Sequence, residues 1–347
     1  MKIFINGRFL TQKFSGVQKF SYEITKELVQ NSNHDITVLV PKNHEINHLY
    51  RINFKIRYIG LFYGHLWEQI SLPLFLSRKG EHLLLNFSNS APIFSFNNFI
   101  TIHDLSIYKD STWFDFFYYH YYKILLPIIV RRAKQIITVS EFSKNEIIKK
   151  FSIQKNSIHV VYNGLSSFFL TKESIEKENN SILFVGSMNN RKNLNIIIDL
   201  VYELPDFTFN LVGVNQEDFN KKFPLYRNNI QIKCLGNVYE SKLTELYNSS
   251  KFFINPSLYE GFGLPIIEAF SRECVVLSSN IDVFHEICDD AAIYFNPNDG
   301  KDLLNKINKL VENKNQCDKL IQLAKNRLKL FNWHVETKKI IKLIQKI

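Results

Sequence analysis

The stretch FFINPSLYEGFGLPIIEAF, residues 252–270, decides the fold. FFIN is an apolar run of strand length, EGFG is a glycine loop, and LPIIEAF has the apolar period of a helix with Pro265 in its first turn. A strand followed by a short loop and a helix is the repeating unit of proteins built on a parallel sheet. The stretch therefore predicts an α/β fold in which a loop at the carboxyl end of a strand opens a helix.

The glycine loop predicts a binding site for an anion. Backbone N–H groups at the start of a helix point outward and attract negative charge, which assigns this role to Phe262, Gly263 and Leu264. Glu260 precedes the loop and is expected near a bound sugar, and Glu268 on the helix is placed to accept hydrogen bonds from a ribose. In the alternative interpretation, the glycines form an ordinary turn and the two glutamates are a solvated cap and a surface residue.

The same alternation of β-branched runs and helical patterns continues along the whole chain. In the first half the strand-like runs are KIFI, ITVLV, NNFITI, QIITVS and SIHVVY, and a helix is expected over about 17–30. In the second half, strands are expected at 182–185, 207–212, 230–234, 252–255 and 275–277, and helices at 194–203, 241–248 and 265–271. From residue 301 the pattern is helical to the end.

The length of the chain predicts two domains. A chain of 347 residues exceeds one ordinary domain, and the polar segment SSFFLTKESIEKENN, 166–180, interrupts the strand and helix alternation. We therefore expect an N-terminal α/β domain over 1–165, a linker over 166–180, and a second α/β domain over 181–331. The last helix, 332–347, is expected to pack back toward the first domain, and Asn163 and Gly164 are interpreted as a hinge.

The positive charge is concentrated in the first half of the chain. Through Leu165 there are 20 Lys and Arg against 11 Asp and Glu, and beyond it 23 against 22. The basic half predicts an acidic partner, either anionic lipid headgroups, a diphosphate-linked acceptor or nucleic acid, although an AT-rich coding sequence would also raise the lysine content. The four scattered cysteines and the absence of a signal sequence or long apolar segment predict a cytoplasmic protein.

A second anion site is predicted by VGSMNNRKN, residues 185–193. Gly186 ends a strand, and Arg191 and Lys192 follow where the next helix is expected to begin. Two cations at the positive end of a helix are unfavourable unless an anion compensates them, so the pattern predicts a bound diphosphate. The alternative is a pair of solvated loop cations.

A third candidate lies in TIHDLSIY, where His103 and Asp104 follow an apolar strand. Open α/β sheets bind ligands at the carboxyl ends of their strands, so this position suits chemistry, although a structural His–Asp pair is the alternative. Upstream, Gly16 lies in a glycine-containing loop before the first helix and is a candidate phosphate contact. The dinucleotide fingerprint G-x-G-x-x-G is missing from this loop. Ser140 in VSEFSKNEI is expected to cap a helix.

Taken together, these motifs resemble the family-four, or group 1, retaining glycosyltransferases, from about Asn6 to Trp333. The resemblance rests on NGRF, LWEQISLPL, TIHDLS, VGSMNNRKNL and EGFGLPIIE. It implies the GT-B fold, two Rossmann-like domains facing across a cleft, with the acceptor in the N-terminal domain and the nucleotide sugar in the C-terminal one. It also implies retention at the anomeric carbon, with the acceptor attacking on the face from which the phosphate leaves.

The resemblance assigns roles to the candidate residues. His103 and Glu260 are the expected catalytic residues, with His103 facing the transferred sugar, and Asp104, Ser187 and Val238 are further candidates. The family usually has a basic residue at the position of Ser187, and Arg191 is a candidate substitute. The segment LGNVYESKL, which contains Val238, is expected to flank the base. The residues expected to bind the donor are Gly16, Gly186, Arg191, Lys192, Phe262, Gly263, Leu264 and Glu268.

The expected reaction transfers a hexose, with GDP-mannose as the first choice of donor, to a saccharide or polyprenyl-diphosphate-linked acceptor in surface polysaccharide synthesis, such as O-antigen or capsule. No cofactor or metal is expected, because no D-x-D pattern is present and the fixed cations are placed to neutralise the leaving diphosphate. No nucleic-acid motif is visible. The helix WFDFFYYHYYKILLPIIVRRAK, 113–134, suits an anionic membrane surface or, alternatively, a buried core. The competing functions are a nucleotide-sugar epimerase and a non-catalytic sugar- or lipid-binding protein.

Overall fold

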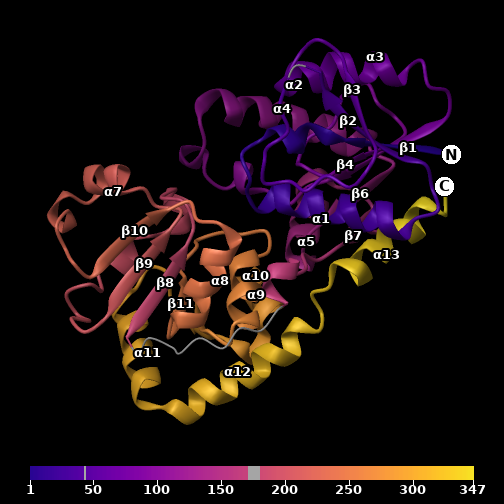
Figure 1. Ribbon diagram of the computed structural model, residues 1–347. Helices are drawn as coiled ribbons and strands as arrows, with labels where there is room; N and C mark the ends of the chain where they lie inside the picture. The colour runs from indigo at the N-terminus through magenta and orange to yellow at the C-terminus, as the bar shows by residue number, and fades with distance from the viewer. Residues whose placement is uncertain (43, 171–179) are drawn as a thin grey trace. The chain divides into compact units, whose positions relative to one another are not determined.

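The computed structural model describes residues 1–42, 44–170 and 180–347. The chain folds into two compact units (Figure 1). Unit 1 combines Met1–Gly164 with Trp333–Ile347, and unit 2 is Leu165–Asn332. The predicted linker, 166–180, falls mostly on residues 171–179, which lie outside the described residues.

Unit 1 is built on a seven-stranded sheet with the order β3-β2-β1-β4-β5-β6-β7, in which every neighbouring pair is parallel. The chain starts at the centre of the sheet and winds outward in both directions, as in doubly wound folds. The strands are β1 (Lys2–Asn6), β2 (Ile36–Pro41), β3 (Ile56–Ile59), β4 (His82–Asn86), β5 (Asn98–Thr101), β6 (Gln135–Thr138) and β7 (Ile158–Val160).

Two of these strands, β3 and β4, are missing from the sequence prediction. HLLLN in β4 is a short apolar run, which periodicity alone does not separate from a buried helix, and IRYI in β3 lies at the sheet edge with its central residues exposed. The helices of unit 1 are α1 (Gly16–Asn31), α2 (Gly64–Leu66), α3 (Leu72–Leu76), α4 (Phe116–Arg132), α5 (Glu141–Phe151) and α13 (Trp333–Ile344). A π-helical turn, η2 (Trp67–Ser71), joins α2 to α3.

Unit 2 repeats the pattern with a six-stranded parallel sheet of order β10-β9-β8-β11-β12-β13. Its strands are β8 (Ser181–Val185), β9 (Thr208–Val212), β10 (Ile232–Gly236), β11 (Phe252–Asn255), β12 (Val275–Ser279) and β13 (Ile293–Phe295). Its helices are α6 (Asn195–Ile198), α7 (Gln216–Lys222), α8 (Glu240–Ser249), α9 (Leu264–Ser271), α10 (Asp282–Cys288), α11 (Gly300–Glu312) and α12 (Lys314–Leu328). The α/β class predicted from residues 252–270 is therefore confirmed in both units.

The helix expected over 194–203 is much shorter in the structure, because α6 covers only Asn195–Ile198. After Ile198 the chain forms turns with i, i+3 hydrogen bonds instead, in which the Leu200 amide donates to the Ile197 carbonyl at 3.1 Å and the Val201 amide to the Ile198 carbonyl at 3.2 Å. The continuous helical pattern expected from residue 301 is divided into α11, α12 and α13. In the described part of the chain, no helix has the length and hydropathy to cross a bilayer.

The last helix returns to unit 1, where α13 contacts α1. The Trp333 ring packs edge to face with Phe20 of α1, with ring centroids 5.7 Å apart. A Cβ at Gly164 would lie 2.6 Å from the backbone nitrogen of Trp333, so only glycine allows this approach. Gly164, which the sequence suggests is a hinge, is therefore required because the backbone at the start of α13 packs directly against it.

Candidate active site

In unit 2, two loops meet at the carboxyl ends of the central strands β8 and β11. The loop after β8 contains the three-residue turn η7 (Asn190–Lys192), and the loop after β11 leads into α9. The amide of Leu258 donates to the carbonyl of Arg191 at 2.8 Å, and the Arg191 guanidinium donates to the carbonyl of Tyr259 at 2.8 Å. These contacts hold Arg191 and Lys192 beside Glu260.

The Glu260 carboxylate accepts from both cations. Arg191 Nη1 lies 2.9 Å from Glu260 Oε2, and Lys192 Nζ forms an ion pair with Glu260 Oε1. The Ser257 hydroxyl also donates to Oε1, at 3.1 Å. The neighbouring cations of Arg191 and Lys192 require a compensating anion. The Glu260 carboxylate, which lies between them, is one such anion within the chain.

Electrostatics keep this carboxylate ionised although it is buried. Burial raises the pKa of Glu260. The charges of Arg191 and Lys192 lower it by more than burial raises it, and the resulting pKa is about 2. With two cations and one carboxylate, the cluster keeps a formal charge of one positive unit at neutral pH. Such a cluster attracts a polyanion and holds its cations in a fixed geometry.

The glycine loop opens α9 as predicted from the sequence. Gly263 is the N-cap of α9, with φ +99°, and a Cβ there would lie 2.8 Å from Phe284 Cε1. Phe262 is buried and packs edge to face on Phe331. Leu264 is the first residue of the helix, and Glu268 lies one turn further along, buried, with the Tyr247 hydroxyl donating to its Oε2 at 3.3 Å.

The other candidates of unit 2 lie at the same edge of the sheet. Gly186 directly follows β8 and closely approaches Gly213 after β9, where a Cβ would lie 2.6 Å from the Gly186 carbonyl oxygen. Ser187 is exposed, and Val238 is half-buried in the loop between β10 and α8. The structure therefore brings Arg191, Lys192 and Glu260 into contact, while Ser187 and Val238 lie on neighbouring loops.

In unit 1, His103 is buried just beyond the end of β5. Its Nε2 lies 2.9 Å from the carbonyl oxygen of Phe87, which only accepts, so Nε2 carries the proton of the neutral ring and Nδ1 is the acceptor. Burial lowers the pKa of His103, against the opposing effects of the Phe87 carbonyl and Asp104. The Ser143 hydroxyl donates to the His103 carbonyl at 3.1 Å, which ties the start of α5 to this loop.

Asp104, Gly16 and Ser140 have simpler surroundings. The Asp104 carboxylate accepts from the amide of Ser106 at 2.8 Å and so shapes the turn after His103. Gly16 is the first residue of α1, is exposed, and has open space where a Cβ would lie. Ser140 caps α5 through a hydrogen bond from the Ser143 amide, which confirms its predicted role.

A buried polar cluster beside β1 was not predicted from the sequence. Arg8, just after β1, lies 3.4 Å from Glu68 of η2 and donates to Ser90 at 2.7 Å. Glu68 is fully buried and accepts from the Asn6 amide group at 2.7 Å, and His65 lies 3.4 Å from its second oxygen. Burial raises the pKa of Glu68, but the opposing charge of Arg8, with His65 and Asn6, lowers it to about 2.

The signal for this cluster is present in the sequence. The motifs NGRF and LWEQISLPL each contain a single charged residue, Arg8 and Glu68, and such a charge requires a partner if it is buried. The sequence alone does not show that these residues meet, because they are far apart in the chain: Asn6, which also contacts Glu68, is 62 residues from it. The cluster fixes the loop after β1 at the carboxyl edge of the sheet, which is the edge that also carries His103.

Comparison with known proteins identifies two family models in this chain. "Glycosyltransferase Family 4" matches residues 14–167, and "Glycosyl transferases group 1" matches residues 167–327. The O-antigen chain mannosyltransferase RfbU of Salmonella typhimurium is 31% identical over 240 residues, which cover 67% of this chain and 65% of the relative. O-antigen chain mannosyltransferase B of Escherichia coli is 30% identical and is covered to 57%, so the chain spans less than two thirds of each relative.

Solved structures share the fold over nearly the whole chain. Sucrose-phosphate synthase from Thermosynechococcus elongatus matches with a TM-score of 0.78 at 14% identity, covering 99% of this chain and 98% of its own. Anabaena Alr3699/HepE, solved in complex with UDP, matches with a TM-score of 0.75 at 17% identity, covering 100% of both chains. This likeness, with the two parallel sheets, confirms that the fold is GT-B with two Rossmann-like units.

Proposed function

Because the chain belongs to the group 1 and family 4 glycosyltransferases, we propose that it transfers a hexose from a nucleotide diphosphate sugar to a saccharide or lipid-linked saccharide. Mannose is the first choice, supported by the two O-antigen mannosyltransferases that it resembles. The acceptor then belongs to a cell-surface polysaccharide. The single observation that carries this proposal is the cluster of Arg191, Lys192 and Glu260 at the carboxyl edge of the unit 2 sheet.

The cluster is suited to bind the diphosphate of the donor. Arg191 and Lys192 present two fixed cations, and Glu260 orients them without neutralising both. When the bond between sugar and diphosphate breaks, negative charge develops on the leaving phosphate, and cations already held in place stabilise that charge without rearranging. In this proposal Glu260 orients the two cations and lies close to the transferred sugar.

The start of α9 supplies the second half of the donor site. The N-cap of this eight-residue helix is Gly263, which has no side chain to occupy the positive end of the helix. We assign the backbone around Phe262, Gly263 and Leu264 to the phosphates or the sugar, and Glu268 to the ribose. The UDP complex of HepE supports a nucleotide as the ligand of such a fold.

In unit 1 we assign His103 to the transferred sugar. Its neutral ring donates from Nε2 to Phe87, which leaves Nδ1 to accept a hydrogen bond from a sugar hydroxyl. The proposed reaction retains the anomeric configuration: the acceptor oxygen attacks on the face from which the diphosphate leaves, and a phosphate oxygen takes the acceptor proton. Gly16 is assigned to the donor phosphates, and the family resemblance supports that role.

The proposed reaction needs no divalent metal, since we assign the neutralisation of the diphosphate to the cations of Arg191 and Lys192. The test is donor turnover in EDTA, with and without added magnesium or manganese. Equal rates are expected. A protein that is inactive in EDTA and recovers with either ion would contradict this proposal.

The choice of donor is tested by slow hydrolysis of nucleotide sugars, which needs no acceptor. The purified protein is incubated with GDP-mannose, UDP-glucose, UDP-N-acetylglucosamine and dTDP-rhamnose, and the released nucleoside diphosphate is measured. GDP-mannose is expected to be consumed fastest. Preference for a UDP- or dTDP-sugar would refute the choice of mannose, and binding without hydrolysis of any donor would favour a non-catalytic protein.

We also propose that unit 1 lies on an anionic membrane surface through the start of α4. Phe116 and Phe117 expose 67% and 80% of their area, whereas Leu125, Leu126 and Ile129 in the second half of α4 are buried in the core. Exposed aromatic side chains on a basic unit favour a lipid interface. Flotation on phosphatidylglycerol vesicles should fall in Phe116→Ser/Phe117→Ser and be unchanged in Leu225→Ser, an exposed apolar residue of unit 2. Equal flotation of all three proteins would exclude this surface.

A further inference from the structure

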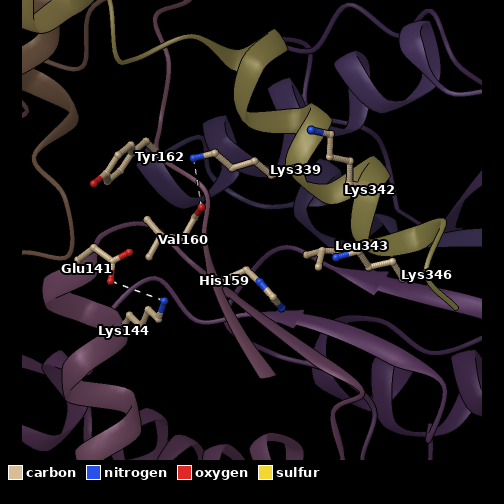
Figure 2. Close-up of a pocket in the computed structure, with 9 residues that line it drawn as sticks. All are labelled: Glu141, Lys144, His159, Val160, Tyr162, Lys339, Lys342, Leu343 and Lys346. Atoms are coloured by element: carbon tan, nitrogen blue, oxygen red, sulfur yellow. Dashed lines mark hydrogen bonds and ion pairs between the residues drawn. The ribbon is translucent and has the colours of Figure 1, made fainter. Parts of the chain in front are cut away.

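A basic pocket of about 390 Å³ lies within unit 1, between the start of α5, the edge strand β7 and the last helix α13. We call it the α13 pocket. Figure 2 shows the side chains that line it, with those of α13 on one side and those of α5 and β7 on the other. Its lining residues are Glu141, Lys144, His159, Val160, Tyr162, Lys339, Lys342, Leu343 and Lys346.

Four lysines and one glutamate line this pocket, a formal excess of three positive charges with His159 neutral. Two of the lysines have carboxylate partners: Lys144 lies 3.7 Å from Glu141, and Lys339 lies 2.7 Å from Glu336. In residues 1–42, 44–170 and 180–347, no carboxylate lies within ion-pair distance of Lys342 or Lys346. The pocket therefore keeps uncompensated positive charge.

Three of the four lysines of the pocket lie on one face at the end of α13. Lys339, Lys342 and Lys346 are spaced by three and four residues, which places them side by side, although Lys346 lies just beyond the last residue of the helix. Like charges at this spacing repel one another and destabilise a helix, unless an anion lies between them. The Lys339 ammonium also lies 5.3 Å from the centre of the Tyr162 ring. It donates to the Val160 carbonyl at 3.5 Å, a hydrogen bond that a dashed line marks in Figure 2.

The opposite wall adds one cation, Lys144, and the His159 ring, beside one carboxylate, Glu141. α5 is eleven residues long, and its first turn, with Glu141 and Lys144, faces the pocket. His159 on β7 donates from Nε2 to the side-chain oxygen of Gln135 on β6, at 2.7 Å. Partial burial lowers the pKa of His159, and the positive charges of Lys144 and Lys346 lower it as well, by smaller amounts. A bound anion would oppose these two lysines, so the ring would take up a proton more readily.

We propose that the α13 pocket binds a phosphate-bearing anion of small size, either the headgroup of an anionic phospholipid or a soluble phosphorylated compound. Its volume is that of a site for a small molecule, and its lysines act as point charges for phosphate oxygens. None of the residues assigned to the donor lines it. The proposal is independent of the proposed transfer reaction, since the pocket lies wholly in unit 1 and outside the donor site.

The test compares the full chain with Lys342→Gln/Lys346→Gln, which removes the two lysines without a carboxylate partner. The matched control is Lys314→Gln/Lys319→Gln, which removes two exposed lysines of α12 and changes the net charge equally. In the soluble arm, sodium pyrophosphate is added and the His159 imidazole is titrated by NMR, with His159→Gln to assign its signal. His159 reports binding in this pocket even if pyrophosphate also binds in unit 2.

A soluble ligand is indicated if pyrophosphate raises the pKa of His159 in the wild type and control, but causes no rise in Lys342→Gln/Lys346→Gln. A lipid headgroup is indicated if pyrophosphate has no effect, while partitioning to phosphatidylglycerol vesicles falls in that variant and is unchanged in the control. At the usual contribution of a lysine near an anionic surface, losing two lysines weakens partitioning roughly 30-fold. If the variant and control behave alike in both arms, the pocket is only a solvated basic surface and the proposal is wrong.

Discussion

Replacing Glu260 by glutamine tests whether this carboxylate holds the two cations of unit 2 in place. The substitution keeps the size of the side chain but leaves Arg191 and Lys192 without their counter-charge. A pKa lowered from 4.5 to about 2 corresponds to about 3 kcal/mol of stability, at about 1.4 kcal/mol for each pKa unit. Glu260→Gln should therefore lower the free energy of unfolding of unit 2 by about 3 kcal/mol at pH 7.

The sign of the pH dependence follows from the lowered pKa. The ionised carboxylate stabilises the folded chain fully above pH 4.5, and this stabilisation disappears as the pH falls from 4.5 toward 2. The wild type should therefore lose stability in this range, and the difference between it and Glu260→Gln should shrink. Protonation of the wild-type carboxyl group removes the same charge as the substitution.

The two units can be followed separately in a urea titration. All three tryptophans, Trp67, Trp113 and Trp333, belong to unit 1, so tryptophan fluorescence reports unit 1, whereas far-ultraviolet circular dichroism reports both units. Glu260→Gln should change the circular dichroism transition and leave the fluorescence transition unchanged. The control is Glu217→Gln, an exposed glutamate of α7 paired with Lys221, whose loss should have little effect. A Glu260→Gln protein as stable as this control at pH 7 would refute the reasoning.

Three further outcomes are expected. Gly263→Ala should destabilise unit 2 by about 1–3 kcal/mol, because φ at this position is +99° and the added Cβ would clash with Phe284. Circular dichroism should show this loss of stability, whereas the control Gly300→Ala, where a Cβ has room, should be as stable as the wild type. Glu68→Gln should destabilise unit 1 by about 3–5 kcal/mol, because Arg8 loses its buried partner. The fluorescence transition should be unchanged in the control Glu81→Gln, at an exposed glutamate, and an unchanged transition in Glu68→Gln would contradict the prediction. The lowered pKa of His103 means that the unfolded chain binds a proton more readily, so unit 1 should lose stability as the pH falls below 6.5, and His103→Gln should flatten that decline in the same fluorescence assay.

Local patterns in the sequence predict the parts of this fold that depend on local structure. The strand, glycine loop and helix at residues 252–270 appear as β11, the loop and α9, and Ser140 caps α5 as expected. α6 is shorter than predicted because the chain after Ile198 forms turns with i, i+3 hydrogen bonds, which an apolar pattern does not separate from a continuing α-helix. β4 was missed because five residues are too few to reveal a period.

The contacts within the candidate site could not be predicted, because they join distant parts of the chain. The sequence indicates Lys192 and Glu260 separately, but their ion pair spans 68 residues and depends on β8 and β11 being neighbours in the sheet. The sequence therefore predicts a bound diphosphate beside Arg191 and Lys192, but not that Glu260 pairs with both cations. The Arg8 and Glu68 pair depends in the same way on the π-helical turn that brings residue 68 toward β1.

The central claim, that unit 2 binds a nucleoside diphosphate through Lys192 and Glu268, is tested most directly by calorimetric titration in EDTA. GDP, UDP and dTDP are titrated into the wild type, Lys192→Ala, Glu268→Ala and the control Lys221→Ala, an exposed lysine of α7. The wild type and Lys221→Ala should bind at least one of the three, with GDP preferred, and binding should be abolished in Lys192→Ala and in Glu268→Ala. Wild-type affinity for all three nucleotides in both of these variants would contradict the proposed donor site.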